Sequence, residues 1–274
     1  MPSVDVVVPT TRPSIIDLVM SLSLGTVVPD NIWVVSNEQR PHWPGVAVVT
    51  FDSDTQPIGR GDAGLRRDIG ADMSEADILV FLDDDLIAPR QMLEKTVEIV
   101  ERDGFCWGHH RFLDFTPLRE RNDLSSLLDK PPEEGRSREA YVNDWHGWQS
   151  SYAGLLGIRR DLFWEVGGFD LGFLGYHGSE DQHLGRRLSN GKNRTFVHEP
   201  PFAWHPEEDL FHAEPLTNVE GSHQLRTVTV NGQHFATCEI CPYRRPSEPG
   251  ALVLSDQVAI PYSRSDFRIE KEWT

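Results

Sequence analysis

Residues 78–85 read Ile-Leu-Val-Phe-Leu-Asp-Asp-Asp, and this stretch decides the fold. Its five apolar residues predict a buried strand, and a run of three carboxylates begins where the strand ends. Residues 4–8, Val-Asp-Val-Val-Val, predict a second fully buried strand. Strands that are almost continuously apolar are typical of a parallel sheet with helices on both faces.

The rest of the chain supplies the helices and further strands that such a sheet needs. Short β-rich runs alternate with helical periodicity in the first third of the sequence, which is typical of an α/β fold. Apolar spacing and turn residues predict strands at 32–35, 46–51 and 105–110, and helices at 15–22, 65–73, 93–100, 160–166 and from 179 onward. The predicted fold class is therefore α/β, with a mixed, mostly parallel sheet flanked by helices.

The last quarter of the chain has a different pattern. Residues 227–235 predict a β-hairpin, because Asn231-Gly232 suits the positive φ angles of a type I′ turn. The proline-rich C-terminal segment predicts an extended arm. Cys238 and Cys241, beside the hairpin, have the spacing of a structural zinc pair. Two reduced, partly buried thiols are the alternative.

Residues 113–140 are rich in charged side chains and have few apolar anchors. Such a stretch cannot bury enough surface to offset the entropy lost on ordering, so we expect a mobile excursion from the fold. A lid over a ligand site and a plain surface loop are the two alternatives for its function.

Composition restricts the class of protein. The 43 Asp and Glu residues against 26 Lys and Arg give a net charge of −17, so we expect no nucleic-acid partner. No apolar run approaches the roughly 18 to 20 residues of a bilayer span, so we also expect no membrane span. The N-terminal residues lack the pattern of a signal peptide, and three cysteines are too few for a disulfide framework. We therefore expect a cytoplasmic protein.

Three groups of polar residues are candidates for chemistry. The carboxylates of residues 83–85 stand at the edge where open α/β sheets bind ligands, and clustered oxygens suit Mg²⁺ or Mn²⁺. An exposed acidic turn is the alternative, but three like charges in one turn are costly without a cation or a basic partner. Glu180-Asp181 opens a helix, where the helix dipole stabilises acids without any catalytic role. His205 suits either a metal ligand or a surface histidine.

The order of these elements resembles that of the GT-A nucleotide-sugar glycosyltransferases, particularly family 2, with a galactosyltransferase-type carboxyl-terminal motif. The motifs that carry this resemblance, over about residues 4–206, are Val6-Val7-Val8-Pro9-Thr10-Thr11-Arg12, Arg67-Asp68-Ile69-Gly70, Leu82-Asp83-Asp84-Asp85, Gly167-Gly168-Phe169-Asp170 with Gly178-Ser179-Glu180-Asp181, and His205. Two departures stand out. Ser36-Asn37-Glu38 replaces the usual Asp pair after the second strand, and Asp68 replaces the usual Asn.

The resemblance implies roles for the residues on the donor side. Asp85 and His205 would bind the metal, Mn²⁺ or Mg²⁺. Asp83 would contact the ribose or a metal-bound water. The other donor-binding residues that the resemblance implies are Pro9, Thr10, Arg12, Glu38, Arg67 and Asp84.

The resemblance also implies roles on the acceptor side. Asp181 would be the general base that removes the proton of the attacking hydroxyl, and Glu180 would bind an acceptor hydroxyl. Trp148 would offer a flat face to a sugar ring, or else fill the core. The implied organisation is a donor-binding half at residues 1–112, an acceptor-binding and catalytic half of the same domain at 113–206, and a C-terminal hairpin and arm at 207–274.

The implied function is a metal-dependent glycosyltransferase, with hexosyl transfer expected. It would move a sugar from a nucleotide diphosphate, with UDP-sugars favoured, to the hydroxyl of a small-molecule or glycan acceptor. We expect inversion with Asp181 as the base, although Glu180-Asp181 is also compatible with retention. The alternatives are a non-catalytic module that binds nucleotide sugars or glycans, and a sugar nucleotidyltransferase. The latter needs a Gly-rich phosphate loop, which Pro9-Thr10-Thr11-Arg12 does not provide.

Overall fold

The computed structural model describes residues 1–10, 12, 14–36, 46–51, 63–136, 153–170, 180–188, 200–207, 225–230, 233–238 and 267–270. Among the predicted site residues, Glu38, Trp148, Cys241 and the side chain of Cys238 lie outside the described part of the chain. The two turn residues of the predicted hairpin also lie outside it. The predictions of a zinc site and of a sugar-stacking tryptophan therefore remain predictions.

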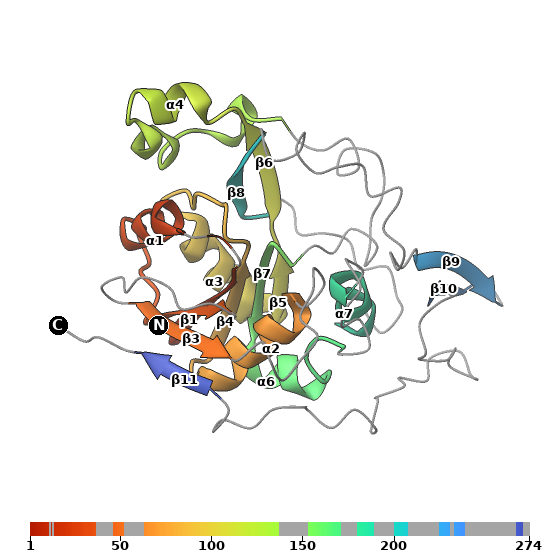
Figure 1. Ribbon diagram of the computed structural model, residues 1–274. Coiled ribbons are helices and arrows are strands. Elements are labelled where there is room, and N and C mark those ends of the chain that lie inside the picture. The colour runs from red at the N-terminus through yellow and green to blue at the C-terminus, as the bar shows by residue number, and fades with distance from the viewer. Residues whose placement is uncertain are drawn as a thin grey trace.

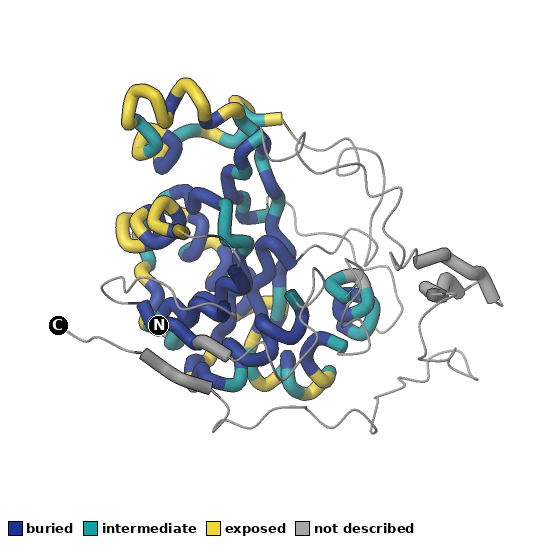
Figure 2. Tube along the Cα trace, viewed as in Figure 1, coloured by how far each residue is buried: buried dark blue, intermediate teal, exposed yellow. Residues whose placement is uncertain are grey.

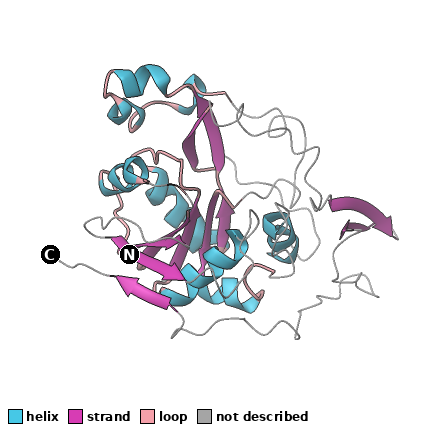
Figure 3. Ribbon diagram, viewed as in Figure 1, coloured by secondary structure: helices cyan, strands magenta, loops and turns pink. Residues whose placement is uncertain are grey.

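In the described part of the chain, a seven-stranded mixed sheet forms the centre of the fold (Figures 1 and 3). Its strand order is β11-β3-β2-β1-β4-β7-β5. The strands are β1 (Val4–Pro9), β2 (Asn31–Ser36), β3 (Val46–Phe51), β4 (Ile78–Leu82), β5 (Phe105–Trp107), β7 (Leu155–Arg159) and β11 (Phe267–Glu270). The four strands from β3 to β4 are parallel, while β7 is antiparallel to both its neighbours and β11 is antiparallel to β3. The predicted fold class is confirmed.

Helices cover both faces of this sheet. The helices α1 (Ile16–Ser23) and α3 (Met92–Asp103) pack on one face, and α2 (Ala63–Met73), α6 (Arg160–Glu165) and α7 (Glu180–Leu188) pack on the other. Alternate residues of β1 enter the two layers: Val6 and Val8 join the core under α1, and Val7 joins the core under α2. All six residues of β1 are buried (Figure 2), which explains its almost unbroken apolar sequence.

The strand predicted at residues 105–110 is in fact two strands in different sheets. Strand β5 ends at Trp107, and β6 (His109–Leu113) pairs in parallel with β8 (Phe202–Pro206). Between them, Gly108 N–H donates to the carbonyl of Leu155 at 2.8 Å, and His109 N–H donates to the carbonyl of Pro201 at 2.8 Å. The chain thus passes at Gly108 from pairing with β7 to pairing with β8. The local sequence does not show this change.

Residues 113–136 are packed, and the prediction of a mobile excursion with few apolar anchors is wrong for them. They form α4 (Thr116–Glu120) and two short 3₁₀ turns, η2 (Leu124–Leu127) and η3 (Pro132–Glu134), beside β6 and β8 (Figure 1). Phe115 and Leu127 are buried in a third apolar cluster together with Trp204 of β8. The Trp204 indole donates to the carbonyl of Leu127 at 2.9 Å. Phe115 and Leu127 could not be recognised as anchors from the local sequence, because Trp204, their partner, is distant in the sequence.

The C-terminal strands agree with the predicted hairpin and refine the predicted arm. Strands β9 (Leu225–Val230) and β10 (Gln233–Cys238) are antiparallel, with Val230 opposite Gln233, so a two-residue connection joins them as predicted. The arm includes β11, which pairs with the outer edge of β3. In the described part of the chain, none of the helices combines the length and the hydropathy of a transmembrane segment.

The packing of residues 113–136 leads to the first prediction. Replacement of buried Phe115 by alanine removes a ring from the third apolar cluster and leaves a cavity. We expect Phe115→Ala to lower the free energy of unfolding by about 3 to 5 kcal/mol in urea titrations. Exposed Glu120→Ala, in the adjacent helix, should change it by less than about 0.5 kcal/mol. A neutral effect of Phe115→Ala would contradict the packed arrangement.

Candidate functional site

The candidate site forms at the carboxyl edge of the parallel strands. Strand β1 lies between β2 and β4, so the strand order reverses at β1, and open α/β sheets bind ligands outside such a switch point. Because β1 and β4 are parallel neighbours, the residues that follow them meet at the same edge. Thr10 and Arg12 follow β1, and the aspartates of residues 83–85 follow β4.

Arg12 supplies the basic partner that three consecutive carboxylates require. Its Nε donates to Asp84 Oδ1 at 3.0 Å, and its Nη2 donates to Asp85 Oδ2 at 2.9 Å. The hydroxyl of Thr10 donates to the other oxygen of Asp84 at 2.6 Å. The Arg12 side chain remains 40% exposed, so this cation compensates the acidic turn from the solvent side.

Arg67 is a second cation in the site, and it is buried. Its Nη2 donates to Asp83 Oδ1 at 2.9 Å, and its Nη1 donates to Glu180 Oε1 at 3.2 Å. Only 6% of its side chain is exposed, and its guanidinium carbon lies 5.5 Å from the centre of the Phe169 ring. Arg67 therefore joins the acidic turn after β4 to the first turn of α7, two segments that are far apart in the sequence.

A short strand contact brings His205 to the same place. Ile87 and Trp204 exchange two backbone hydrogen bonds of 2.9 Å, which holds β8 against the segment that follows the acidic turn. The neighbouring His205 then places Nε2 3.5 Å from Asp85 Oδ2. The Phe112 ring on β6 lies 5.0 Å from the imidazole, centre to centre. The two residues that resemblance assigns to a metal are thus side by side.

Asp85 has the most perturbed electrostatics of the acidic turn. Burial raises the pKa of its carboxyl to about 6, and the charges of Asp83 and Asp84 act in the same direction, while His205 and Arg12 oppose the rise. Its Oδ1 is buried and has no hydrogen-bond partner among the residues that the structure describes. A buried carboxylate oxygen without a donor is costly, so this group favours a cation.

The donor atoms of Asp85 and His205 fit a divalent metal. Asp85 offers Oδ1, which has no partner among the described residues, and Oδ2, which lies 3.5 Å from Nε2 of His205. Carboxylate oxygens suit Mg²⁺ and Mn²⁺, and imidazole nitrogen is a common ligand of divalent transition metals. Among the described residues, no group of three or more His, Cys, Asp or Glu side chains is arranged to hold a metal ion. The pair alone would leave several positions of an octahedral shell for oxygen atoms of a ligand or water.

Asp181, the predicted general base, lies in the first turn of α7 and is partly buried. Its neighbour Glu180 is tied to Arg67. Pro9, predicted on the donor side, is the last residue of β1 and is buried beside this edge of the sheet. The described residues thus bring the predicted donor-side and acceptor-side groups to one region, and the link between them passes through Arg67.

Three residues that sequence reasoning did not select also shape the site. Arg66 is buried and donates to the carbonyl of Thr10. Asp83 N–H donates to the carbonyl of Gly154 at 3.1 Å, and a Cβ on Gly154 would lie 2.4 Å from Asp83 Oδ2 and 2.6 Å from His110 Nε2. Only glycine leaves room for these two side chains. The Gly154-Leu155-Leu156-Gly157 pattern was a sequence signal for close packing, whereas nothing local distinguished His110 or Arg66.

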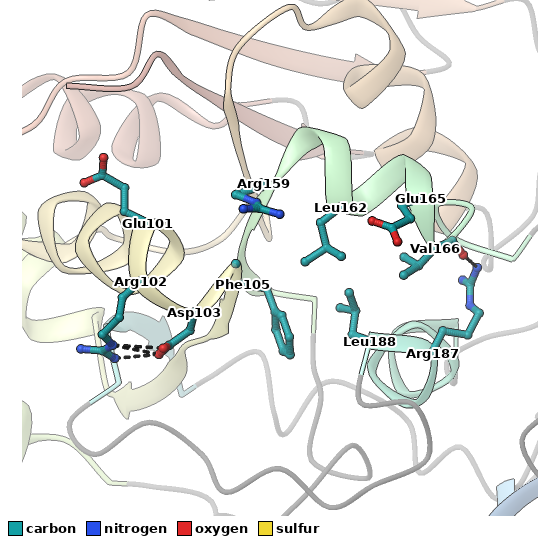
Figure 4. Close-up of a pocket in the computed structure, with 11 residues that line it drawn as sticks. Glu101, Arg102, Asp103, Phe105, Arg159, Leu162, Glu165, Val166, Arg187 and Leu188 are labelled. Carbon is teal, nitrogen blue, oxygen red and sulfur yellow. Dashed lines mark hydrogen bonds and ion pairs between the residues drawn. The ribbon is translucent and has the colours of Figure 1, made fainter.

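A pocket of about 340 Å³ lies elsewhere on the protein (Figure 4). Phe105, Leu162, Val166 and Leu188 form its apolar lining, and the Arg102–Asp103 ion pair stands at its margin. None of the predicted site residues that the structure describes lines it. The candidate site is therefore defined by the charged groups at the carboxyl edge of the sheet.

Comparisons with known proteins agree with the fold. Residues 55–167 match the model of glycosyl transferase family 2, and this segment contains Arg67 and the acidic turn. Residues 1–349 of S. aureus TarS in complex with UDP-GlcNAc have a similar structure, with a TM-score of 0.54 and 13% identity over 79% of this chain and 61% of that chain. GalNAc-T7 with UDP, GalNAc and Mn²⁺ has a TM-score of 0.52 and 15% identity over 75% of this chain and 44% of that chain.

The chain thus has the GT-A fold, and its residues 55–167 are similar to glycosyl transferase family 2. The predicted resemblance is confirmed at this level. The chain spans less than two thirds of the TarS and GalNAc-T7 chains that it matches. No curated protein matches its sequence.

The position of Arg67 leads to the second prediction. Arg67→Met removes the cation between Asp83 and Glu180 and leaves two carboxylates in a partly buried space. We expect it to lower the free energy of unfolding by about 3 kcal/mol at neutral pH, because an uncompensated buried charge is destabilising. Adding Glu180→Gln should recover part of this loss in a double-mutant cycle. Additive effects of the two substitutions would show that Arg67 and Glu180 do not interact.

Proposed function

We propose that this protein is a metal-dependent glycosyltransferase that transfers a hexose from a UDP-sugar to an acceptor hydroxyl with inversion. One observation carries the proposal. Asp85 and His205 belong to separate elements, 120 residues apart, and face each other at 3.5 Å at the switch point of a GT-A sheet. The UDP, UDP-GlcNAc and Mn²⁺ present in the TarS and GalNAc-T7 structures support the choice of donor and metal.

The donor side of the proposed site lies at the ends of β1 and β4. Asp85 and His205 would hold a divalent cation, which when bound would neutralise charge developing on the departing diphosphate. Thr10 and Arg12 lie at the same edge, and the half-exposed guanidinium of Arg12 is placed to bind phosphate oxygens. In this proposal residues 1–112 bind the donor.

The acceptor side lies at the first turn of α7. Asp181 would accept the proton of the attacking hydroxyl, a step that typically contributes about 10²- to 10⁴-fold in rate. Glu180 would accept a hydrogen bond from an acceptor hydroxyl through its second carboxylate oxygen, while its first oxygen binds Arg67. Arg67 is too deeply buried to be mainly a donor-binding residue, and its two ion pairs favour a role in holding Asp83 and Glu180 at a fixed separation.

The third prediction tests the reaction and its base together. Wild-type protein with Mn²⁺ should release UDP from a UDP-sugar in the presence of acceptor, and a chelator should abolish the release. Asp181→Asn should bind UDP and Mn²⁺ as tightly as wild type in calorimetry but lose at least about 10²-fold in turnover.

The control for this experiment is Asp161→Asn, an equal change of charge at an exposed position on α6. It should leave turnover unchanged. Full turnover in chelator would remove Asp85 and His205 from metal binding. An Asp181→Asn variant that keeps more than about a tenth of wild-type turnover would remove Asp181 from the role of base.

The fourth prediction concerns Arg12 and the metal. Arg12 Nη2 donates to Asp85 Oδ2, the oxygen that also faces His205. A divalent cation held by Asp85 and His205 would share this carboxylate with the guanidinium of Arg12, and because two cations repel each other, Arg12 would oppose metal binding. We expect Arg12→Gln to tighten Mn²⁺ binding by about tenfold in the absence of donor, equivalent to about 1.4 kcal/mol.

The measurement for Arg12→Gln is a titration of free Mn²⁺ by electron paramagnetic resonance, which needs no activity. Exposed Arg121→Gln makes the same change of net charge at the end of α4 and should shift the affinity by less than about twofold. Unchanged or weaker Mn²⁺ binding by Arg12→Gln would show that the guanidinium does not compete with the metal.

A further inference from the structure

The turn that follows α6 is built around a buried carboxylate on another helix. Asp68 of α2 accepts a hydrogen bond of 2.8 Å from the backbone N–H of Phe169. Gly168, at φ +64°, approaches this carboxylate so closely that a Cβ would lie 2.8 Å from Asp68 Oδ1. Residues 166–170 therefore wrap around the side chain of Asp68, which is 5% exposed as a residue.

Helix α7 is attached to the same turn. The guanidinium of Arg187 donates to the carbonyls of Val166 and Gly168, and the first of these contacts is visible in Figure 4. His183 Nδ1 lies 3.3 Å from Asp170 Oδ2. The turn thus receives an acceptor from α2 on one side and donors from α7 on the other.

These contacts fix the position of α7 along its own axis, which apolar packing alone leaves free. Leu184 and Leu188 hold α7 against the core of this face, but hydrophobic contact is not directional. Hydrogen bonds have preferred directions, so the attachment to the turn determines where the first turn of α7 lies along the helix axis. Glu180 and Asp181 are in that first turn.

We propose that Asp68 is a positioning residue for the acceptor side of the site. By holding the N–H of Phe169, it fixes residues 166–170, which through Arg187 fix the position of α7 and hence of Glu180 and Asp181. The proposal rests on the proposed function, in which Asp181 is the base. Asp68 directly follows Arg67, so two successive residues of α2 fix α7, one through the turn and one through Glu180.

Burial raises the pKa of the Asp68 carboxyl well above its usual range, while the bond from Phe169 and the charges of Arg187 and Arg67 oppose the rise. A neutral acceptor can therefore serve in its place. Asparagine keeps a carbonyl oxygen at Oδ1, whereas alanine leaves the N–H of Phe169 buried without a partner.

The test compares Asp68→Ala and Asp68→Asn with the control Ile69→Val. Ile69 is buried in the same core on the same helix, and its apolar side chain cannot form a hydrogen bond to the turn. Two quantities are measured: hydrogen exchange of the amides of residues 180–188, and kcat together with donor affinity. For Asp68→Ala we expect exchange in α7 about tenfold faster, kcat lower by about tenfold or more, and donor affinity within about threefold of wild type. Asp68→Asn should restore both exchange and kcat.

The inference is overturned if Asp68→Asn is as impaired as Asp68→Ala, or if Ile69→Val at a similar melting temperature shows the same changes. It is also overturned if donor affinity falls in parallel with kcat, because the defect would then not be confined to the acceptor side. Hydrogen exchange does not depend on activity. A wild-type protein without transferase activity but with the expected exchange pattern would refute the proposed function and leave the positioning of α7 by Asp68 in place.

Discussion

Charge compensation at the carboxyl edge of the sheet is the constraint on which the site depends. The aspartates of residues 83–85 and Glu180 gather in a small, partly buried space, where carboxylates repel one another strongly. Arg12 and Arg67 each bind two of these carboxylates. The acidic turn, the loop after β1 and the first turn of α7 are therefore held together by two cations from elements that are separate in the sequence.

The topology explains why these groups meet. Parallel neighbours place the ends of β1 and β4 together, and the Ile87–Trp204 bridge adds β8 to the same edge. Trp204 also binds the carbonyl of Leu127, so the third apolar cluster supports the position of His205 beside Asp85. The packed segment that the sequence presents as a polar excursion is thus part of the scaffold of the candidate site.

Elements with a local signal were predictable, and pairings between distant elements were not. The strands at residues 4–9 and 78–82 are apolar on both faces because helices cover both faces, and this pattern is visible in the sequence. The carboxylates after β4 were recognisable as a candidate site because three acidic residues directly follow a buried strand. The change of partner at Gly108 depends on Leu155, and the pairing of β11 with β3 depends on an exposed sheet edge. Neither partner can be read from neighbouring residues.

The two arginines of the site differ in a way that suits separate roles. Arg67 is 6% exposed, so its guanidinium would be left buried without a counter-charge if it lost its two carboxylate partners. Arg12 is 40% exposed, and water can solvate its guanidinium when it leaves the acidic turn. A cation at Asp85, as proposed, would therefore compete with Arg12 and leave the connection from Asp83 through Arg67 to Glu180 in place. In the proposed function, the donor side would exchange its counter-ion while the acceptor side keeps its geometry.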